Sequence, residues 1–297
     1  MLSIDLSEIG VSKAHHYLLS AVGPRPICFA STIDEKGRSN LAPFSFFNVF
    51  SSNPPIAVFS PSRSGRTGQH KDTFNNVQKV KQVVINLVNY KMVEQMSLAS
   101  SPYPPETDEF VKSGLTPLKS ELIKPFRVKE APVQMECEII EIKELGQSGG
   151  AGNLVICKIL KMHIAEELLN DEKMIDQEKI DLVARMGGDW YCRTDSKSMF
   201  EIKKPISSKS IGFDEMPNEV LNSTILSGND LGKLGGIEGL PDETDVNEFR
   251  LIELSDLFLE FEDNAKALEI ALHKKAKYFL SKNQLEAAWK TLLSFNN

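Results

Sequence analysis

Two basic residues that stand close together in the chain could bind an anion. Arg63 and Lys71 follow an apolar run that reads as a strand, and the loop between them contains Gly65 and Gly68. Loops with glycine let backbone amides approach an anion, and an arginine can hold a phosphate through two parallel hydrogen bonds. Residues 61–71 therefore predict a site for one phosphate group.

Simpler roles compete with phosphate binding at these positions. A polar loop is usually a solvated surface loop, and we keep that interpretation for Arg66. Asp72 and Thr73 begin a predicted helix, so capping its free amides is the ordinary role for both.

The residues before this loop mix apolar side chains with hydrogen-bonding groups. Between positions 23 and 60, runs of Val, Ile and Phe alternate with Ser, Thr and Asn. The apolar residues favour strands, and the hydroxyls and amides between them supply hydrogen-bonding groups at fixed positions. Together with the basic pair, this mixture suits a flat aromatic ligand that carries one phosphate.

At these residues the chain resembles a known family, the flavin reductase-like proteins, which bind FMN in a split β-barrel. Each matching piece is short, and their order and spacing together carry the resemblance. It covers residues 12–205 and leaves residues 206–297 outside. The matching pieces are Pro24-Arg25-Pro26, Ser31-Thr32, Asn40-Leu41-Ala42-Pro43-Phe44-Ser45-Phe46-Phe47-Asn48, Asn53-Pro54-Pro55, Lys71-Asp72-Thr73 and Arg185-Met186-Gly187-Gly188.

The resemblance implies a cofactor and the residues that hold it. FMN would be the cofactor, and NAD(P)H the co-substrate whose hydride passes to the flavin and on to a second acceptor. Arg63, Lys71 and Thr73 are implied for the phosphate. The residues implied for the rest of the FMN site are Ser31, Thr32, Ala42, Pro43, Phe44, Ser45, Phe46, Asn48, Ser60 and Asp72, with Arg185 and Tyr191 as second-tier candidates.

One histidine is the candidate for catalysis. His163 ends a predicted strand, and in some relatives of the family a histidine near this place faces the nicotinamide. A lone histidine at a strand end is more often a satisfied or solvated side chain than a catalytic one. His163 therefore carries two interpretations, a catalytic and a structural one.

The resemblance implies a mainly β (α+β) fold, an FMN-binding split β-barrel with peripheral helices and a C-terminal helical extension. The local patterns agree: residues 25–33 read as a strand, and residues 34–37 as a tight turn into a return strand. Pro43 lacks a backbone donor, so we expect strand pairing to be interrupted there.

A glycine-rich stretch at residues 145–153 needs a separate interpretation. A dinucleotide-binding fingerprint should follow a strand and open a helix. Residues 154–164 instead read as another strand. We therefore predict a flexible hairpin turn and reject a Rossmann site.

The chain is expected to have three parts: an FMN-binding domain over residues 1–205, a Gly- and Ser-rich linker or wrapping loop over residues 206–243, and a helical hairpin over residues 244–297. Apolar residues recur at helical spacing through 268–280 and 285–293. One hairpin cannot bury both apolar stripes by itself, so we expect it to dock on its own barrel or on a partner subunit.

Composition excludes several classes of function. Hydrophobic residues make up 41% and charged residues 25%, as in ordinary soluble proteins, and a net charge of −7 argues against general nucleic-acid binding. No apolar run reaches membrane-spanning length and residues 1–10 lack a signal-peptide pattern, so we expect a cytoplasmic protein without a membrane partner. The four cysteines are too widely spaced for a zinc or iron–sulfur site; they are Cys28, Cys137, Cys157 and Cys192.

Three functions remain in competition at this level. The first is an NAD(P)H-dependent flavin reductase, acting alone or with a monooxygenase. The second is a flavoredoxin-like FMN electron carrier without a nicotinamide site, and the third is a non-redox flavin-binding or interaction protein. The electron acceptor would be a small molecule or a protein.

A homodimer is expected, because family members pair their barrels. The chain also has more phenylalanine side chains than one small barrel needs; they are Phe44, Phe46, Phe47 and Phe50.

Overall fold

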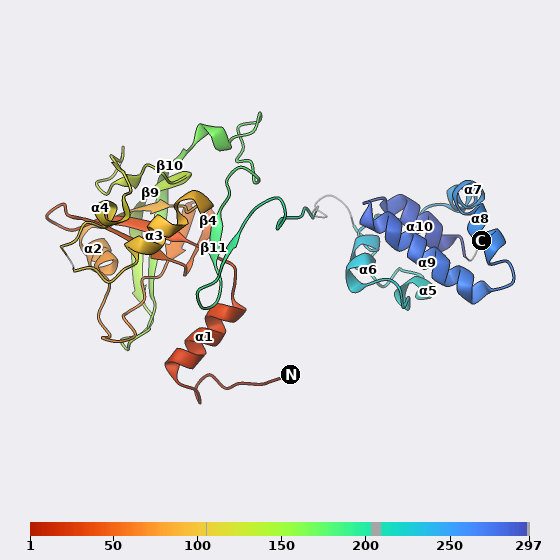
Figure 1. The fold of residues 1–297 in the computed structure, drawn as a ribbon, viewed down its shortest axis with the longest axis horizontal. Coiled ribbons are helices and arrows are strands. Elements are labelled where there is room, and N and C mark those ends of the chain that lie inside the picture. The colour runs from red at the N-terminus through yellow and green to blue at the C-terminus, as the bar shows by residue number, and fades with distance from the viewer. Residues whose placement is uncertain (105, 203–208, 296–297) are drawn as a thin grey trace. The chain divides into compact units, whose positions relative to one another are not determined.

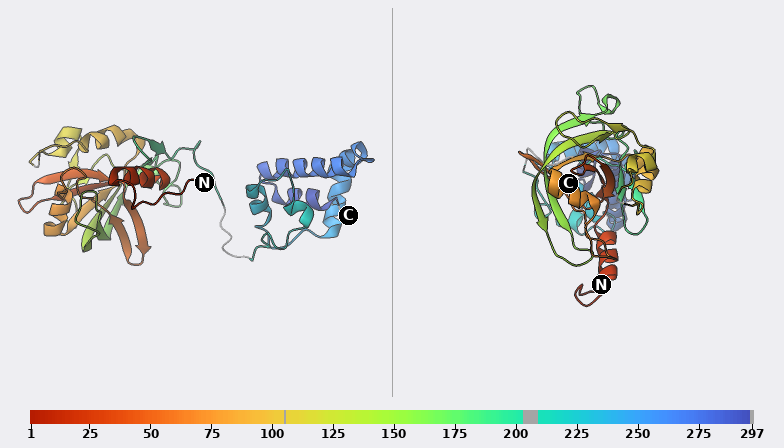
Figure 2. Two further views of the ribbon diagram at one scale, coloured as in Figure 1. Left: turned by 90° about the horizontal axis from the view of Figure 1, so that it is seen from below. Right: turned by 90° about the vertical axis from the view of Figure 1, so that its left-hand side faces the viewer.

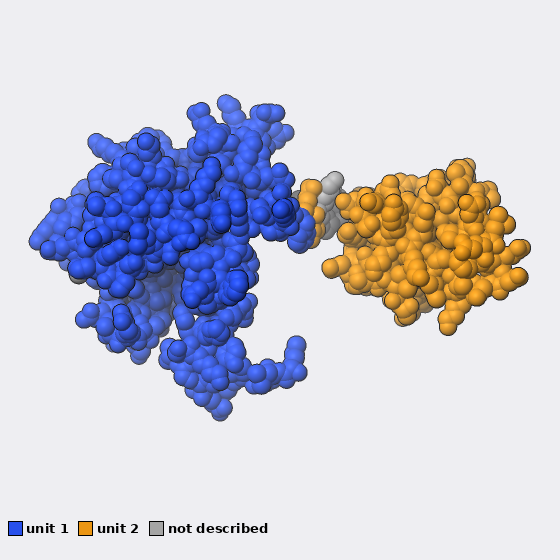
Figure 3. Space-filling model, viewed as in Figure 1, with its two compact units in different colours: residues 1–200 blue, residues 201–297 orange. Residues whose placement is uncertain are grey.

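The computed structural model describes residues 1–104, 106–202 and 209–295. The chain divides into two compact units, residues 1–200 (unit 1) and 201–297 (unit 2), which Figure 3 shows in two colours. The expected domain boundary at residue 205 and the first expected linker residues, 206–208, lie outside the described residues.

Unit 1 contains the named strands of the described residues together with several helices. Its helices are α1 (Val11–Ala21), α2 (Asp72–Val80), η1 (Tyr90–Met92), α3 (Val93–Ala99), α4 (Glu109–Ser113) and η2 (Glu166–Leu168). Its strands are β1 (Arg25–Pro26), β2 (Cys28–Ile33), β3 (Ser39–Phe44), β4 (Phe47–Ser52), β5 (Pro55–Phe59), β6 (Gln82–Asn86), β7 (Pro117–Leu118), β8 (Arg127–Val128), β9 (Val133–Glu144), β10 (Asn153–Ile164), β11 (Val183–Arg185) and β12 (Tyr191–Arg193).

Seven strands form one antiparallel sheet in the order β3-β2-β6-β9-β10-β5-β4. The two edge strands, β3 and β4, are consecutive in the chain and are separated only by Ser45 and Phe46. A flat sheet of this width would hold its edges about 29 Å apart. Three peptide units span at most about 11 Å. The sheet must therefore curve strongly, and the Ser45-Phe46 link marks the place where its edges approach.

The expected interruption of pairing at Pro43 is wrong. Pro43 lies within β3 and is in register with Phe29 of β2, and the ladder continues to Phe44. A proline costs a strand no hydrogen bond when its missing N–H faces away from the sheet. Because β3 is an edge strand, it can accommodate Pro43. The expected glycine-rich hairpin turn is confirmed, since it joins β9 to β10.

The two faces of the curved sheet bury separate apolar clusters. One contains Cys28 and Ala30 of β2 together with the inward residues of β9 and β10. The other contains Phe29 of β2 and is covered by α3 and α4, which Figure 1 and Figure 2 show beside the sheet. By contrast, α1 lies at the edge of unit 1 and buries none of its residues.

Unit 2 is helical. Its helices are α5 (Asn218–Leu221), α6 (Gly228–Leu234), α7 (Glu243–Glu253), α8 (Ser255–Glu260), α9 (Ala265–Ser281) and α10 (Leu285–Leu293). The two predicted apolar stripes lie on α9 and α10, which pack together. In the stretch expected to be a linker or wrapping loop, the described residues form α5 and α6, and Ile211 and Leu234 belong to the same core as Trp289. The Trp289 indole donates a hydrogen bond to the Leu234 carbonyl at 3.0 Å.

Candidate functional site

The loop of residues 61–70 is fastened to the turn between β9 and β10. The Arg63 amide donates a hydrogen bond to the Ala151 carbonyl at 2.9 Å. A Cβ atom added to Gly149 would lie 3.0 Å from the Ser64 carbonyl oxygen. Glycine at this position therefore lets the two backbones approach closely.

The Arg63 guanidinium is held by groups from both segments. Its Nη1 donates to the Gly68 carbonyl at 3.2 Å, and its Nη2 lies 2.8 Å from Glu144 Oε2 at the end of β9. The same carboxylate oxygen is 3.7 Å from His70 Nε2, and the His70 ring stacks on Phe74 with centroids 4.0 Å apart. The sequence analysis identified neither Glu144 nor His70: Glu144 lies 81 residues from Arg63 and meets it only in the folded sheet, whereas His70 lies in the loop itself and carries no motif.

Buried polar atoms without partners concentrate at this loop. Among the described residues, seven buried side-chain polar atoms lack a hydrogen-bond partner, and four of them belong to the loop or to the strand beneath it. Leaving such an atom unpaired costs about 1–3 kcal/mol, so a polar ligand or ordered water is needed to satisfy it. A phosphate oxygen could accept from the donors among them, Ser62 Oγ and Arg63 Nε, whereas the amide oxygen of Asn153 needs a donor such as water. The four atoms are Ser62 Oγ, Arg63 Nε, His70 Nδ1 and Asn153 Oδ1.

Asn153 is a site residue that the sequence did not reveal. Its side chain is fully buried at the start of β10, where it donates a hydrogen bond to the Pro61 carbonyl at 2.8 Å. Its backbone N–H donates a second hydrogen bond to Ser60 Oγ at 3.0 Å. Asn153 therefore holds the two adjacent residues at which β5 passes into the 61–70 loop. The sequence signal that could have indicated it is an asparagine directly after a glycine-rich turn and before an apolar strand.

Lys71 and Asp72 lie where the 61–70 loop enters α2. Lys71 is the N-cap residue, with extended backbone angles, and its own side chain makes no capping hydrogen bond. Its side chain is exposed and has no ion-pair partner among the residues that the structure describes. Asp72 is exposed in the first turn, where a carboxylate is favourable to the helix dipole. Within the described residues, Lys71 is thus an unpaired cation beside the free amides of a helix start.

A chain of hydrogen bonds connects α2 to β2 and β3. The Thr73 hydroxyl donates to Asn40 Oδ1 at 2.7 Å, and the Thr32 hydroxyl donates to the same oxygen at 3.2 Å. The Asn76 amide donates to Thr32 Oγ1 at 3.1 Å. Thr32 and Thr73, both predicted for the site, are therefore brought together, while Asn40 and Asn76 are connecting residues whose roles the sequence did not indicate.

Glu109 fastens this network from the opposite side. Its carboxylate accepts hydrogen bonds from the Asn40 side chain at 3.3 Å and from the Leu41 amide at 3.1 Å. Burial raises the pKa of Glu109, and these hydrogen bonds oppose the rise in part. The arrangement anchors β3 to α4 and keeps Asn40 in position.

The link between β3 and β4 lies close to the start of the 61–70 loop. The Ser60 amide donates to the Phe46 carbonyl at 2.8 Å, so Ser60 connects the two segments. Phe46 and Asn48 are exposed, whereas Ser31 is fully buried with an unpaired hydroxyl. The remaining predicted residues, all half-buried, are Ala42, Pro43, Phe44 and Ser45.

Arg185 and Tyr191 form a pair on the neighbouring small sheet of β1, β11 and β12. The Arg185 guanidinium carbon lies 4.6 Å from the centre of the Tyr191 ring. Opposite Arg185, the buried Arg25 donates hydrogen bonds to the Leu19 carbonyl at 2.6 Å and the Met186 carbonyl at 2.8 Å. Burial, and then the nearby charge of Arg185, lower the pKa of Arg25. Strand β1 also contacts β4, so the small sheet that carries Arg185 and Tyr191 lies next to the β4 edge of the large sheet.

His163 belongs to a different cluster. Its Nε2 lies 2.8 Å from Glu136 Oε1, and its Nδ1 lies 3.7 Å from Glu121 Oε1. His163 is ten positions along β10 from Asn153, a separation of roughly 33 Å for an extended strand. The structure therefore does not bring the catalytic candidate together with the predicted phosphate residues.

The buried carboxylate of Glu136 organises this second cluster. Its two oxygens accept hydrogen bonds from the Glu121 amide at 2.9 Å and the Leu122 amide at 2.7 Å. Burial opposes ionisation of Glu136, but these amides and the His163 ring outweigh it and lower the pKa of the carboxyl group. The cluster fixes the segment around residue 121 on the outer face of β9.

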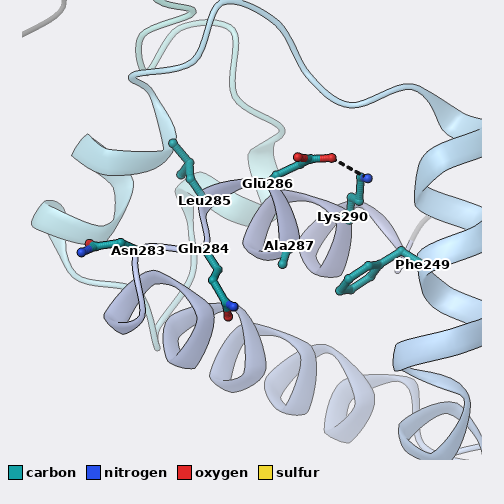
Figure 4. A pocket seen from close by; sticks show the side chains of 7 residues that line it. All are labelled: Phe249, Asn283, Gln284, Leu285, Glu286, Ala287 and Lys290. Atoms are coloured by element: carbon teal, nitrogen blue, oxygen red, sulfur yellow. Dashed lines mark ion pairs between the residues drawn. The ribbon is translucent and has the colours of Figure 1, made fainter. Parts of the chain in front are cut away.

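Hollow volume does not identify the site. A hollow of about 480 Å³ in unit 2 is lined by residues of α7 and α10 and of the turn before α10, and Figure 4 shows its Glu286–Lys290 ion pair, which spans 2.6 Å. A hollow of about 530 Å³ in unit 1 lies between the 34–37 turn and the end of α2. Neither hollow is lined by a residue predicted to bind flavin. The candidate site is therefore defined by its charged groups and its unpaired polar atoms.

The described residues contain neither a metal-binding cluster nor a membrane-spanning helix. No group of three or more His, Cys, Asp or Glu side chains there could hold a metal ion. Within the same ranges, no helix is both long and apolar enough to span a membrane.

Known proteins are similar to much of this chain. A family model described as the flavin reductase like domain matches residues 21–179. An Aquifex aeolicus protein described as uncharacterized is 36% identical over 189 residues, which cover 63% of this chain and 93% of that protein.

Two solved structures extend the similarity to the fold. Nitrilotriacetate monooxygenase component B from Bacillus cereus is 30% identical with a TM-score of 0.64, and the match covers 68% of this chain and 98% of that one. The 2-nitrobenzoate 2-nitroreductase NbaA from Pseudomonas fluorescens is 27% identical with a TM-score of 0.63, covering 71% of this chain and 100% of that one.

Proposed function

Because this chain belongs to the family of proteins with a flavin reductase like domain, we propose that it binds FMN and catalyses flavin reduction by NAD(P)H. The observation that carries the proposal is the cluster at the 61–70 loop. There Arg63, with its unpaired Nε, and the unpaired Ser62 hydroxyl lie in the loop that contacts the glycine-rich turn, and Lys71 follows at the start of α2. Such a cluster suits a ligand with a single phosphate.

In this proposal different residues of unit 1 bind the phosphate and the flavin ring of FMN. Arg63 and Lys71 bind the phosphate, while Thr73, whose hydroxyl is committed to Asn40, fixes the start of α2 beside it. The flavin itself supplies the electron-transfer chemistry that protein side chains lack. The residues proposed along the ring and ribityl chain are Ser31, Thr32, Ala42, Pro43, Phe44, Ser45, Phe46, Asn48, Ser60 and Asp72, bordered by Arg185 and Tyr191.

The acceptor of the electrons is proposed to be a second molecule. One similar protein is a component of a monooxygenase and another is a nitroreductase, so both a protein and a small molecule are reasonable acceptors. The flavoredoxin-like alternative is favoured by one observation. His163, the residue predicted to face the nicotinamide, is paired with the buried Glu136 and is only 17% exposed.

Two measurements test the proposal. An absorbance spectrum of the purified protein, before and after incubation with FMN, should show bound flavin. NAD(P)H oxidation in the presence of FMN should then exceed the rate without protein. Bound flavin without NAD(P)H oxidation would support the electron carrier, and failure to bind any flavin would refute both functions.

We also propose that the curved sheet is a split β-barrel and that the protein works as a homodimer. Phe47 is buried in the core and Phe44 packs against Phe59, which leaves Phe46 and Phe50 exposed on or next to the edge strand β4. Exposed aromatic side chains on a sheet edge suit a second copy of the chain. A flavin-loaded monomer in light scattering at low concentration would contradict the dimer.

A further inference from the structure

The ion pair between Arg63 and Glu144 uses only part of the arginine. Glu144 Oε2 lies 2.8 Å from Nη2, while the neighbouring Nε is buried and has no partner among the described residues. Nη1 is occupied by the Gly68 carbonyl. The edge of the guanidinium formed by Nε and Nη2 therefore has a free donor at Nε, and Glu144 contacts its other nitrogen.

This edge is the one that binds an anion through two parallel hydrogen bonds. Phosphate oxygens can accept from Nε and Nη2 together, and such a bidentate pair is stronger than a single contact. A phosphate bound in this way would satisfy the unpaired Nε. It would also bring a second anion to Nη2, the nitrogen that Glu144 contacts, so the phosphate and the carboxylate would repel each other there.

Glu144 is placed so that it can be displaced. Its side chain is 41% exposed, whereas that of Arg63 is 16% exposed, so the carboxylate can turn into solvent more easily than the guanidinium. Its second neighbour, His70, is 3.7 Å away and forms no close hydrogen bond with it. Even after displacement, a negative charge at the end of β9 would remain near a phosphate and repel it.

We propose that Glu144 is a built-in competitor for the flavin phosphate. Its carboxylate holds Nη2 of Arg63, yields it when a phosphate binds, and weakens that binding so that the flavin exchanges readily. The inference rests on the proposed function, because it assigns the phosphate to Arg63. It concerns how tightly the flavin is held, which decides whether flavin acts as a resident cofactor or as a substrate.

The test compares two charge-removing substitutions on one strand. Glu144→Gln removes the competing charge and keeps the side-chain shape, whereas Glu141→Gln removes an exposed charge that has no ion pair within the described residues. FMN and riboflavin are each titrated into the full-length unsubstituted protein and both variants, with flavin fluorescence as the readout. Glu144→Gln should bind FMN roughly threefold to tenfold more tightly and release it more slowly, the size of one partly exposed charge interaction. Riboflavin affinity, and both affinities of Glu141→Gln, should stay unchanged.

The other outcomes contradict the inference in distinguishable ways. Unchanged FMN affinity in Glu144→Gln would show that the carboxylate does not compete. Weaker binding of both flavins would show that Glu144 positions the 61–70 loop instead. If the unsubstituted protein binds neither flavin, the proposed function itself fails, and this inference fails with it.

Discussion

Arg63 and Lys71 are the two cations on which phosphate binding depends, and their surroundings differ. Arg63 is half-buried and joins the 61–70 loop to the end of β9. Lys71 is exposed at the start of α2 and has no ion-pair partner in the described ranges. Lys71 can therefore be removed with little structural consequence, which makes it the cleaner test of the phosphate site.

Lys71→Ala should weaken FMN binding by about tenfold to a hundredfold, the size of a charge-assisted hydrogen bond. Riboflavin lacks the phosphate, so its affinity should stay nearly constant. Parallel fluorescence titrations of the two flavins measure both effects.

Lys79→Ala is the matched control, because Lys79 lies at the opposite end of the same helix and, within the described residues, its one ion pair is with the exposed Glu35 at 3.7 Å. It should leave both affinities unchanged. Equal losses of FMN and riboflavin affinity in Lys71→Ala would mean that Lys71 acts on the fold or on the ring.

Glu136 provides a prediction about acid stability. Its pKa is lower in the folded protein than the value of about 4.3 expected for an unfolded chain. The unfolded state then binds more protons between these two pKa values, so stability falls as the pH decreases through them. The stabilisation that ionised Glu136 gives the folded state is complete above the pKa of the unfolded chain, and it is lost as the pH falls through the pKa of the folded protein.

Glu136→Gln should therefore destabilise the protein at pH 7 by about 1–3 kcal/mol, the cost of weakening buried hydrogen bonds to a charge. The difference from the unsubstituted protein should narrow as the pH falls below about 4.3 and through the lower pKa of the folded protein, where the carboxyl group becomes protonated. Urea denaturation at the two pH values measures it. Glu138→Gln, at an exposed position two residues further along the same strand, should have little effect at either pH. A difference that stayed constant with pH would assign the effect to packing.

At the scale of elements, the β9–β10 hairpin shapes the candidate site through its turn. The turn contacts the 61–70 loop by backbone alone at Gly149, where an added Cβ would lie 3.0 Å from one carbonyl oxygen and 3.2 Å from the next. The loop would have to shift by a few tenths of an ångström to accept a methyl group. Because Arg63 lies in that loop, the shift should reach the phosphate-binding groups.

Gly149→Ala should accordingly weaken FMN binding several-fold more than riboflavin binding, with a small loss of thermal stability. Gly65→Ala is the control within the loop itself, since a Cβ added there meets no atom within 4 Å. The same titrations, with thermal unfolding, test both. An FMN affinity that is equal in the two variants would show that the hairpin turn does not set the loop position.

At the scale of the whole molecule, each unit contains its own apolar cores. The two clusters of unit 1 lie within residues 27–183, and those of unit 2 lie within residues 211–295. All residues proposed for the FMN site belong to unit 1. Binding of flavin and folding of unit 2 are therefore expected to be separable.

A chain that ends at residue 200 should fold and bind FMN with an affinity close to that of the full chain. The expectation follows because the truncation removes no residue of the site and no member of the two cores of unit 1. Circular dichroism and FMN titration check it. Loss of folding or a large loss of affinity would show that unit 2 is part of the flavin-binding body. A change confined to acceptor kinetics would instead assign unit 2 to the choice of acceptor.

Local patterns in the sequence determined much of this protein before any contact was known. The glycine-rich turn, the two apolar stripes of α9 and α10, and the ordered motifs of residues 24–73 each depend on neighbouring residues. The resemblance built on those motifs is confirmed by the family model. Helix and strand periodicity are local properties, so a single sequence can express them.

Only the tertiary structure decided which distant residues meet. The Arg63–Glu144 pair joins positions 81 residues apart, and the Asn76–Thr32 hydrogen bond joins positions 44 residues apart. Pro43 fits its strand because β3 is an edge strand, a fact about sheet order that β3 alone does not carry. These partners depend on how the seven strands curve and pair, and many sequences with the same local periodicity could pair otherwise. The physical reason is that strand order is set by the total burial and hydrogen bonding of the sheet, which no local stretch encodes.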